Sequence, residues 1–311
     1  IGPQLIRLEP EIIAVLAFAT TAGLGARFLL WHVLLRQLES TSLRVAAVID
    51  LVVNFVNQLL PSRVTGQGLA PVVITATTDV SLSDAIAISG VYAGLYALLY
   101  GLVAAMGLVW IGGRFAPELL ILIVISVSLY LLFGGSILLL GTRFEAASEL
   151  GRPLARPMRN VPFVGQYVDK VMESLANYST DTERTYTALV TDGKTFVTYV
   201  AAWVVVRLVM PTVRYVVLFK AFGFSYDPIV QLPFVILVAY AVTLLPITPG
   251  GIGITEATAA LVFHSLGVPE QVIIPVILLD RFLGVYIPAL LGWIPATQID
   301  YRSIRFTSTP E

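Results

Sequence analysis

The 311-residue chain contains no cysteine, which excludes disulfides, thiolate nucleophiles and thiolate metal sites. Only two histidines occur, His32 and His264, so a histidine-based zinc site is not expected. Charged residues make up only 13% of the chain and the net charge is −1, which gives no basic excess for binding nucleic acid. We therefore expect no cofactor and no nucleic-acid partner.

Apolar residues dominate what is present: they make up 57% of the chain, and the mean hydropathy is +0.86. The hydrocarbon core of a bilayer requires about 20 apolar residues per crossing helix. Runs of that length cover residues 11–35, 84–112, 118–141, 195–219, 229–247 and 271–294, with a more polar run at 43–60 and shorter stretches at 64–78 and 252–268. The composition predicts an all-α polytopic membrane helix bundle, expected in the plasma membrane as a multi-pass protein.

One pattern occurs twice, each time where a long apolar run breaks. Leu59–Gly68 and Leu244–Gly253 both read Leu-Leu-Pro, four variable residues, then Gly-x-Gly. A backbone break inside a bilayer is tolerated only where protein or a water-filled cavity supplies hydrogen-bond partners. Paired breaks in two halves of a chain point to a transport site. The pattern predicts two broken or re-entrant helices in an inverted repeat, and two chance helix kinks are the alternative.

The chain divides into an N-terminal membrane half at 1–142, a polar connection at 143–194 and a C-terminal membrane half at 195–311. The connection carries a cluster of arginines that the positive-inside tendency assigns to the cytoplasm, and it predicts an amphipathic interfacial helix. On that assignment, the loop with Arg36 and Arg44 is also cytoplasmic only if each short broken segment completes a crossing. The two motifs would then enter from opposite sides.

Polar residues lead into the first motif at helical spacing. Asp50, Asn54 and Asn57 lie three, four and seven residues apart, so they share one helix face. An ionisable group in a span is a functional candidate because it costs about 2.5–3.5 kcal/mol or more when unpaired. Arg63, after the break, is suited to a phosphate or carboxylate. The alternative is that these side chains only bind neighbouring helices.

The second motif offers backbone amides as well as a carboxylate. Thr248 and the glycines Gly250, Gly251 and Gly253 precede Glu256. The amides of this segment suit an anion-binding concavity, and the alternative is that the helix start is simply capped by the Thr255 hydroxyl and the Glu256 carboxylate.

The last apolar run contains two adjacent charged residues, Asp280 and Arg281. Neighbouring residues on a helix point about 100° apart, so each of the two requires another partner. We expect Asp280 to pair with Arg63, and Arg281 to pair with Glu256. Arg207 is a weaker candidate because its side chain can snorkel to the interface.

Three tyrosines, Tyr92, Tyr96 and Tyr100, form an i, i+4, i+8 stripe in the run at 84–112. A stripe of this spacing lies on one helix face. Core packing is the first interpretation, and the lining of a cavity or of a lipid chain is the alternative.

The segment Leu245–Ala257 resembles the Pro-Gly-Gly-Leu-Gly-x-x-Glu signature of the lysylphosphatidylglycerol synthase/flippase transmembrane family. Residues Pro249, Gly250, Gly251, Gly253 and Glu256 match it one for one. The segment Pro61–Gln67 is similar to that family's Pro-small-Arg-x-Gly-Glu motif, but it has one extra residue, and Gly66 is followed by Gln67 in place of the acid. Arg281 falls where the family has an arginine.

The resemblance implies a lipid-translocating membrane domain that moves a phospholipid or a polyprenyl-linked lipid between leaflets. It does not imply aminoacyl transfer, which belongs to a separate soluble domain of the two-part members. The resemblance also implies a membrane lipid as substrate. Archaeal relatives are linked to surface glycosylation, which makes glycosylation or lipid-modifying enzymes candidate partners, along with a second copy of the chain. The loss of the acid at Gln67 argues against a mechanism that requires a carboxylate in both motifs.

The leading hypothesis is a lipid flippase or scramblase without ATP hydrolysis, because no Gly-x-x-x-x-Gly-Lys-Ser/Thr phosphate loop occurs. The protein is then not an enzyme. One alternative is an intramembrane enzyme for lipid head groups, with Asp50, Glu256 and Asp280 as acid, base or metal ligands. Another is a membrane assembly partner in surface glycosylation. A channel is disfavoured because no filter sequence is recognisable, and DedA-like transporters are the nearest rival fold.

Overall fold

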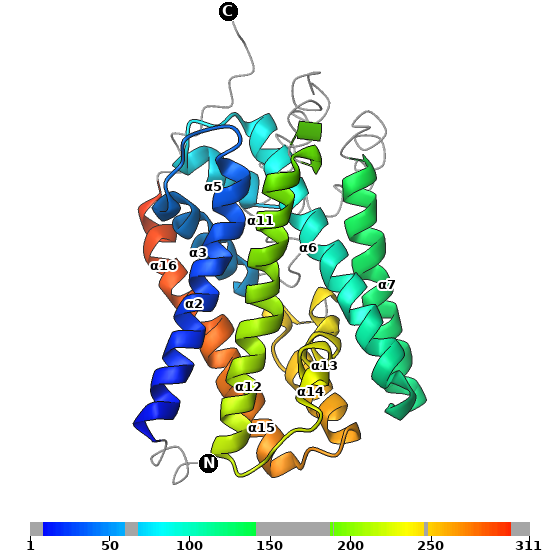
Figure 1. Ribbon diagram of the computed structural model, residues 1–311. Helices are drawn as coiled ribbons and strands as arrows, with labels where there is room; N and C mark the ends of the chain where they lie inside the picture. The colour runs from blue at the N-terminus through cyan, green and yellow to red at the C-terminus, as the bar shows by residue number, and fades with distance from the viewer. Residues whose placement is uncertain (1–8, 60–67, 141–186, 189, 246–247, 300–311) are drawn as a thin grey trace, which may run out of the picture.

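The computed structural model describes residues 9–59, 68–140, 187–188, 190–245 and 248–299, and these segments contain helices and no strand (Figure 1). The N-terminal half has α2 (Pro10–Leu35), α3 (Leu43–Leu59), α5 (Ala70–Thr77), α6 (Leu82–Ile111), η1 (Gly112–Arg114) and α7 (Pro117–Leu140). The C-terminal half has α11 (Gly193–Val204), η2 (Val205–Val209), α12 (Met210–Ala221), η3 (Ile229–Gln231), α13 (Leu232–Ala239), η4 (Ala241–Leu244), η5 (Pro249–Gly251), α14 (Ile254–Ser265), α15 (Glu270–Arg281), η6 (Phe282–Tyr286) and α16 (Ile287–Gln298). The predicted all-α class is confirmed.

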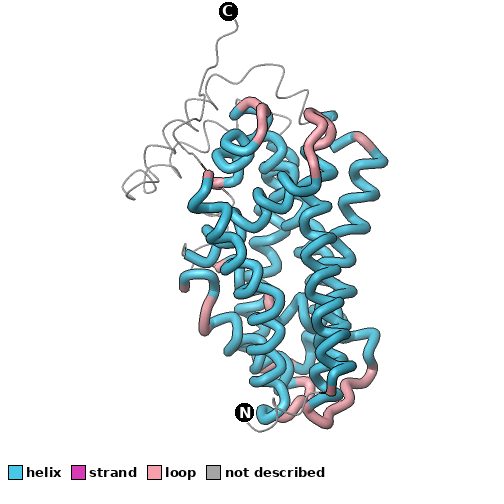
Figure 2. Tube along the Cα trace, turned by 90° about the vertical axis from the view of Figure 1, so that its left-hand side faces the viewer, coloured by secondary structure: helices cyan, strands magenta, loops and turns pink. Residues whose placement is uncertain are grey.

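Within the described segments, 5 helices are long and apolar enough to cross a membrane. They are Pro10–Leu35, Leu82–Arg114, Pro117–Leu139, Gly193–Ala221 and Glu270–Gln298. Figure 2 shows these long helices running along one axis, with most connecting loops gathered at the two ends. The bundle is therefore that of a multi-pass membrane protein.

Two of the expected runs are not crossings. The run at 43–60 forms α3, which stops part-way through the bundle, and α5 returns to the end at which α3 began (Figure 1). The run at 229–247 contains α13, which also stops part-way. α14 returns to the end at which α13 began, and this end is opposite to that of α3 and α5 (Figure 1). The two helices of each pair pack against one another. Each broken motif thus joins the two arms of a re-entrant hairpin.

The hairpins enter from opposite ends of the bundle, as expected, but by a different route. Neither short segment completes a crossing. The prediction that the Arg36 loop and the polar connection share one side only if both segments cross was therefore wrong. α2 ends, α7 ends and α11 begins at one end of the bundle (Figure 1). They share that end because the α3–α5 hairpin returns to it without crossing the bundle (Figure 1). Most of the connection at 143–194, including the part with its expected amphipathic helix, lies outside the described residues, and α11 begins within its last two residues.

The two halves repeat one plan in opposite directions. In the first half, α2 is followed by the α3–α5 hairpin and then by α6; in the second, the α11–α12 helix is followed by the α13–α14 hairpin and then by the α15–α16 helix. α2 and α11–α12 run in opposite senses, as do α6 and α15–α16 (Figure 1). α7 is the extra crossing that reverses the orientation. This is the arrangement of an inverted repeat.

Glycines let the helices approach closely at two places. A Cβ built on Gly134 of α7 would lie 2.5 Å from the backbone nitrogen of Leu98 on α6. A Cβ built on Gly292 of α16 would overlap the carbonyl oxygen of Leu51 on α3. Small residues at membrane helix interfaces allow this backbone contact. The α3–α16 contact matters for function because it fixes the helix that carries Asp50.

Gly292→Ala is expected to destabilise the fold, because the added methyl group must displace the α3 backbone. Overpacking of this kind costs about 1–3 kcal/mol. Gly135→Ala on α7 is the matched control, since a Cβ there meets nothing within 4 Å. Denaturant unfolding in detergent should separate the two variants. Equal stability of both would show that the α3–α16 contact is looser than described.

Candidate functional site

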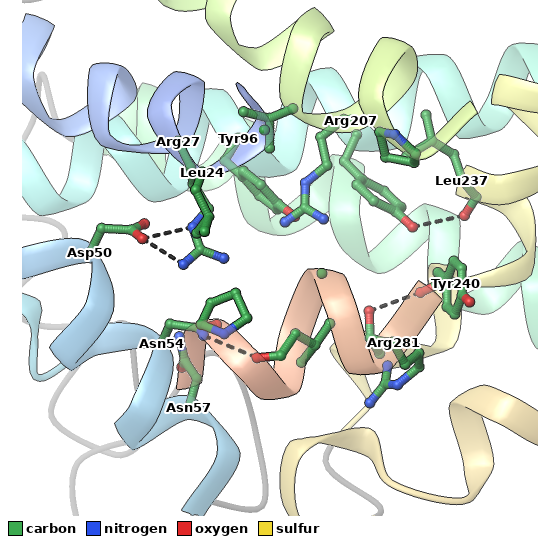
Figure 3. Close-up of a pocket in the computed structure, with 18 of the residues that line it drawn as sticks. Leu24, Arg27, Asp50, Asn54, Asn57, Tyr96, Arg207, Leu237, Tyr240 and Arg281 are labelled. Carbon is green, nitrogen blue, oxygen red and sulfur yellow. Dashed lines mark hydrogen bonds and ion pairs between the residues drawn. The ribbon is translucent and has the colours of Figure 1, made fainter. Parts of the chain in front are cut away.

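A cavity of about 180 Å³ lies inside the bundle and is lined by residues of α2, α3, α6, α7, η2, α12, α13, η4, α15, η6 and α16. Its wall includes six charged side chains, of Arg27, Asp50, Arg207, Arg214, Asp280 and Arg281 (Figure 3). Charged groups in apolar surroundings are costly and mark functional sites in membrane proteins. The cavity is therefore the candidate site.

Two of the wall arginines are held by wall aspartates. The Arg27 Nη2 atom on α2 lies 2.6 Å from Oδ2 of Asp50 on α3, and its Nε donates to the same oxygen at 2.7 Å. The Arg214 Nε atom on α12 donates to Oδ1 of Asp280 on α15 at 2.6 Å. Each pair links two helices, and all four side chains are at least 86% buried, taking the 14% exposure of Arg27 as the largest. In a buried pair each partner compensates part of the cost of burying the other.

The third ion pair is the one expected between Arg281 and Glu256. The Nε atom of Arg281 lies 2.6 Å from Oε1 of Glu256, and the arginine side chain is only 2% exposed. The hydroxyl of Tyr286 donates to the same carboxylate oxygen at 3.0 Å. The other oxygen, Oε2, accepts the backbone N–H of Gly253 at 2.7 Å. Glu256 thus caps α14, as one of the two interpretations predicted, and ties that helix to α15 and η6.

Arg207 differs from the other three arginines. It lies on η2, a five-residue π-helical stretch between α11 and α12, and its guanidinium sits 4.8 Å from the centre of the Tyr96 ring. Single π turns inside α-helices occur frequently at functional sites. The described ion pairs involve the other cavity arginines and not this one. Arg207 points into the cavity beside Tyr96 (Figure 3), so it does not snorkel.

The tyrosine stripe both packs in the core and lines the cavity. Tyr92, Tyr96 and Tyr100 all line the cavity. Tyr92 also stacks on Trp31 with ring centroids 3.9 Å apart, and the Tyr100 hydroxyl donates to the Leu237 carbonyl at 2.8 Å. The stripe therefore forms a packed wall that joins α6 to α2 and α13.

The end of α3 meets the second break next to this cavity. α3 contacts η5, and a Cβ on Gly250 would lie 2.5 Å from Oε1 of Gln58. Gly250, Gly251 and Gly253 all have positive φ, a conformation that favours glycine. The Gly250 carbonyl accepts a hydrogen bond from Nη2 of Arg281 at 3.3 Å. The second motif therefore positions Arg281 through the Gly250 carbonyl, and its glycines are not among the described lining residues.

The sequence-predicted residues fall into three groups. Asp50, Asn54, Asn57, Asp280 and Arg281 line the cavity, and the amide of Asn54 donates to the Val285 carbonyl at 3.5 Å. Thr248, Gly250, Gly251, Gly253 and Glu256 lie behind the wall and are not among the described lining residues. Arg63, Gly66 and Gln67 lie outside the described residues. The expected contact of Asp280 with Arg63 therefore falls outside the described residues. Within them, Asp280 pairs with Arg214.

Sequence reasoning missed Arg27 and Arg214. Both stand inside long apolar runs, so the rule that singled out Asp50 would have found them. Arg214 also follows Arg207 by seven residues, which places both on one helix face. No group of three or more metal-ligating side chains that could hold a metal ion occurs in the described ranges.

The fold and the cavity define a polytopic α-helical membrane protein with two opposed re-entrant hairpins and a charged internal site. A family model described as the lysylphosphatidylglycerol synthase TM region matches residues 1–292. The chain therefore belongs to this family, and the resemblance seen in its second motif is confirmed.

Two archaeal relatives support this assignment. The chain is 23% identical over 292 residues to a UPF0104 membrane protein of Methanothermobacter thermautotrophicus, a match that covers 91% of this chain and 82% of the relative. A stretch of 64 residues is 39% identical to a UPF0104 membrane protein of Pyrococcus horikoshii, and covers 21% of this chain but only 19% of that relative. The names of both relatives state a membrane protein and no activity. No solved structure matches the chain.

Proposed function

We propose that the protein is a lipid flippase or scramblase that moves a phospholipid or a polyprenyl-linked lipid between leaflets. The observation that carries this proposal is the cavity, whose wall holds four arginines and two aspartates inside a membrane bundle. A polar lipid head group requires such surroundings to leave the interface, because unpaired charge is costly in hydrocarbon. Charged side chains already buried in the protein offer it partners.

The size of the cavity favours a head group over a whole lipid. Pockets that enclose a drug-sized ligand measure about 300–1,000 Å³, and this cavity measures about 180 Å³. We propose that the head group enters the cavity while the acyl or polyprenyl chains remain in the bilayer. Described arms of both hairpins, α3 and α13, line the cavity and enter the bundle from opposite ends (Figure 1), so small shifts of these helices would open it to either leaflet.

The arginine partners argue against the enzyme alternative. Asp50, Glu256 and Asp280 each lie 2.6 Å from an arginine nitrogen. Each carboxylate is therefore already engaged by an arginine rather than presented to a substrate. The same pairs are well suited to exchanging partners with a charged head group.

Removing one ion pair as a unit tests the proposal. Replacing a buried pair with apolar residues of similar volume is often neutral for stability. We expect Arg27→Met with Asp50→Leu to keep the fold and to lower lipid translocation about tenfold or more. The measurement is quenching of head-group-labelled phospholipids in proteoliposomes, compared with protein-free vesicles and with a matched exposed variant, Arg44→Met.

Translocation that equals the protein-free rate with the native, folded chain would contradict the proposal. Turnover of the lipid head group in detergent would then favour the enzyme alternative, and stoichiometric co-purification with a glycosylation enzyme would favour the assembly alternative. We extend the proposal to the plasma membrane, to glycosylation or lipid-modifying enzymes as partners, and to association with a second copy. These extensions rest on the family resemblance.

A further inference from the structure

Two hydrogen-bond donors in the cavity wall lack partners within the described part of the chain. One is Nε of Arg207, and the other is the hydroxyl of Tyr96; both atoms are buried. They belong to adjacent side chains, since the Arg207 guanidinium lies 4.8 Å from the Tyr96 ring centre. A buried donor without a partner costs free energy. A ligand that brings acceptor oxygens to this place would remove that cost.

Three other tyrosine hydroxyls at the cavity are already engaged. The Tyr100 hydroxyl donates to the Leu237 carbonyl, and the Tyr130 hydroxyl lies 3.3 Å from the Thr243 hydroxyl. Tyr240 shares a hydrogen bond of 2.7 Å with Tyr215. Arg207 and Tyr96 therefore form a distinct position in the cavity at which only donors point inward. Such a position selects an acceptor with negative charge.

The formal charges around the site set how much negative charge a ligand can bring. Four arginines, Arg27, Arg207, Arg214 and Arg281, line the cavity with Asp50 and Asp280, and Glu256 pairs with Arg281 from behind the wall. These described side chains together carry a formal charge of +1. A phosphodiester carries one negative charge and would neutralise the site. A phosphomonoester carries about 1.5 to 2 at neutral pH, and a diphosphate carries more. Excess charge in an apolar bundle is costly.

We propose that Arg207 and Tyr96 bind the phosphodiester group of a lipid, and that the cavity selects singly charged phosphodiesters over phosphomonoesters and diphosphates. This inference rests on the proposed function, in that it assumes a lipid head group enters the cavity. Glycerophospholipids and polyprenyl phosphosugars both contain this group. Arg207 supplies a guanidinium whose planar fork matches phosphate oxygens, and Tyr96 supplies the hydroxyl donor.

The test measures binding to the purified full-length chain by calorimetry in detergent, separately from translocation. The probes are short-chain phosphatidylglycerol, a short isoprenyl phosphosugar, and the matching isoprenyl monophosphate and diphosphate. We expect one or both phosphodiesters to bind the native chain about tenfold or more tightly than the monophosphate and the diphosphate. The stronger of the first two identifies the natural source of the phosphodiester.

The variants separate the two contacts. Arg207→Gln should weaken phosphodiester binding about tenfold or more, because a hydrogen-bonded charge is lost. Arg207→Lys should restore part of the affinity, since it keeps the charge without the fork. Tyr96→Phe keeps the ring under the guanidinium and should weaken binding severalfold. Arg44→Gln, at an exposed arginine, and Tyr226→Phe, outside the cavity lining, should bind as the native chain does.

Two outcomes would overturn the inference: monophosphate binding as tight as that of the phosphodiesters, or native affinity in a folded Arg207→Gln variant. Its failure is distinguishable from that of the proposed function. A native chain that translocates lipid while the Arg207 and Tyr96 variants bind and translocate normally overturns only the inference. Arg207-dependent phosphodiester binding by a chain that translocates no lipid upholds the inference and overturns the flippase.

Discussion

Glu256→Gln should lower the free energy of unfolding by about 3 kcal/mol, the low end of the cost of breaking a buried ion pair. The reason is that Arg281, at 2% exposure, loses its only described carboxylate partner. The same carboxylate caps α14 through the Gly253 N–H and accepts from Tyr286. Its loss therefore also loosens the hairpin arm that returns from the second break.

Denaturant unfolding in detergent measures this effect, with Glu270→Gln, at an exposed glutamate in the first turn of α15, as the control. The double variant Glu256→Gln with Arg281→Met should recover most of the lost stability, because no unpaired charge then remains buried. A single variant as stable as the native chain would contradict this account of Glu256. A double variant no better than the single one would show that the cap matters more than the pair.

Much of the site could be predicted because membrane chemistry restricts polar residues severely. Asp50, Asn54 and Asn57 recur at helical spacing in an apolar run, and the structure places all three along the cavity. Asp280 and Arg281 are adjacent and so needed separate partners. That argument predicted the contact between Arg281 and Glu256, which the structure contains.

The partner of Asp280 was harder to predict. Arg214 lies 66 positions away from it in the sequence, and only the packing of α12 on α15 brings the two together. Arg27 was missed, and Arg207 was undervalued, for a related reason. A single arginine in a long apolar run is equally compatible with snorkelling and with a cavity, and helix rotation decides between these positions.

Hydropathy also overestimated the crossings. The runs at 43–60 and 229–247 have the composition of spans, yet α3 and α13 stop part-way. Apolar content measures burial, and a hairpin arm buried by protein is as apolar as a helix exposed to lipid. Only the repeated Leu-Leu-Pro and glycine pattern signalled the breaks, and pattern alone does not fix whether the chain crosses or returns.

A thiol in the cavity wall should allow translocation to be switched off. The chain contains no cysteine, so Ala93→Cys introduces a single reactive group on the lining of the cavity. Modification with a sulfonate-bearing methanethiosulfonate adds bulk and negative charge at the place where the head group must pass. We expect lipid translocation to fall about tenfold or more, because a second anion is excluded from a site that one negative charge neutralises.

Ser265→Cys, at the end of α14 and outside the described cavity lining, is the matched control. Its modification should leave translocation unchanged. Reduction of the mixed disulfide should restore the rate in the Ala93→Cys protein, which separates blockage from unfolding.

The most direct test of the central claim, that lipid head groups pass through this cavity, is therefore the translocation rate of a head-group-labelled phosphodiester lipid in Ala93→Cys proteoliposomes before and after modification. The account predicts a reversible loss in the cavity variant and none in the control. A thiol that resists modification, or full translocation with the modified cavity, would contradict it.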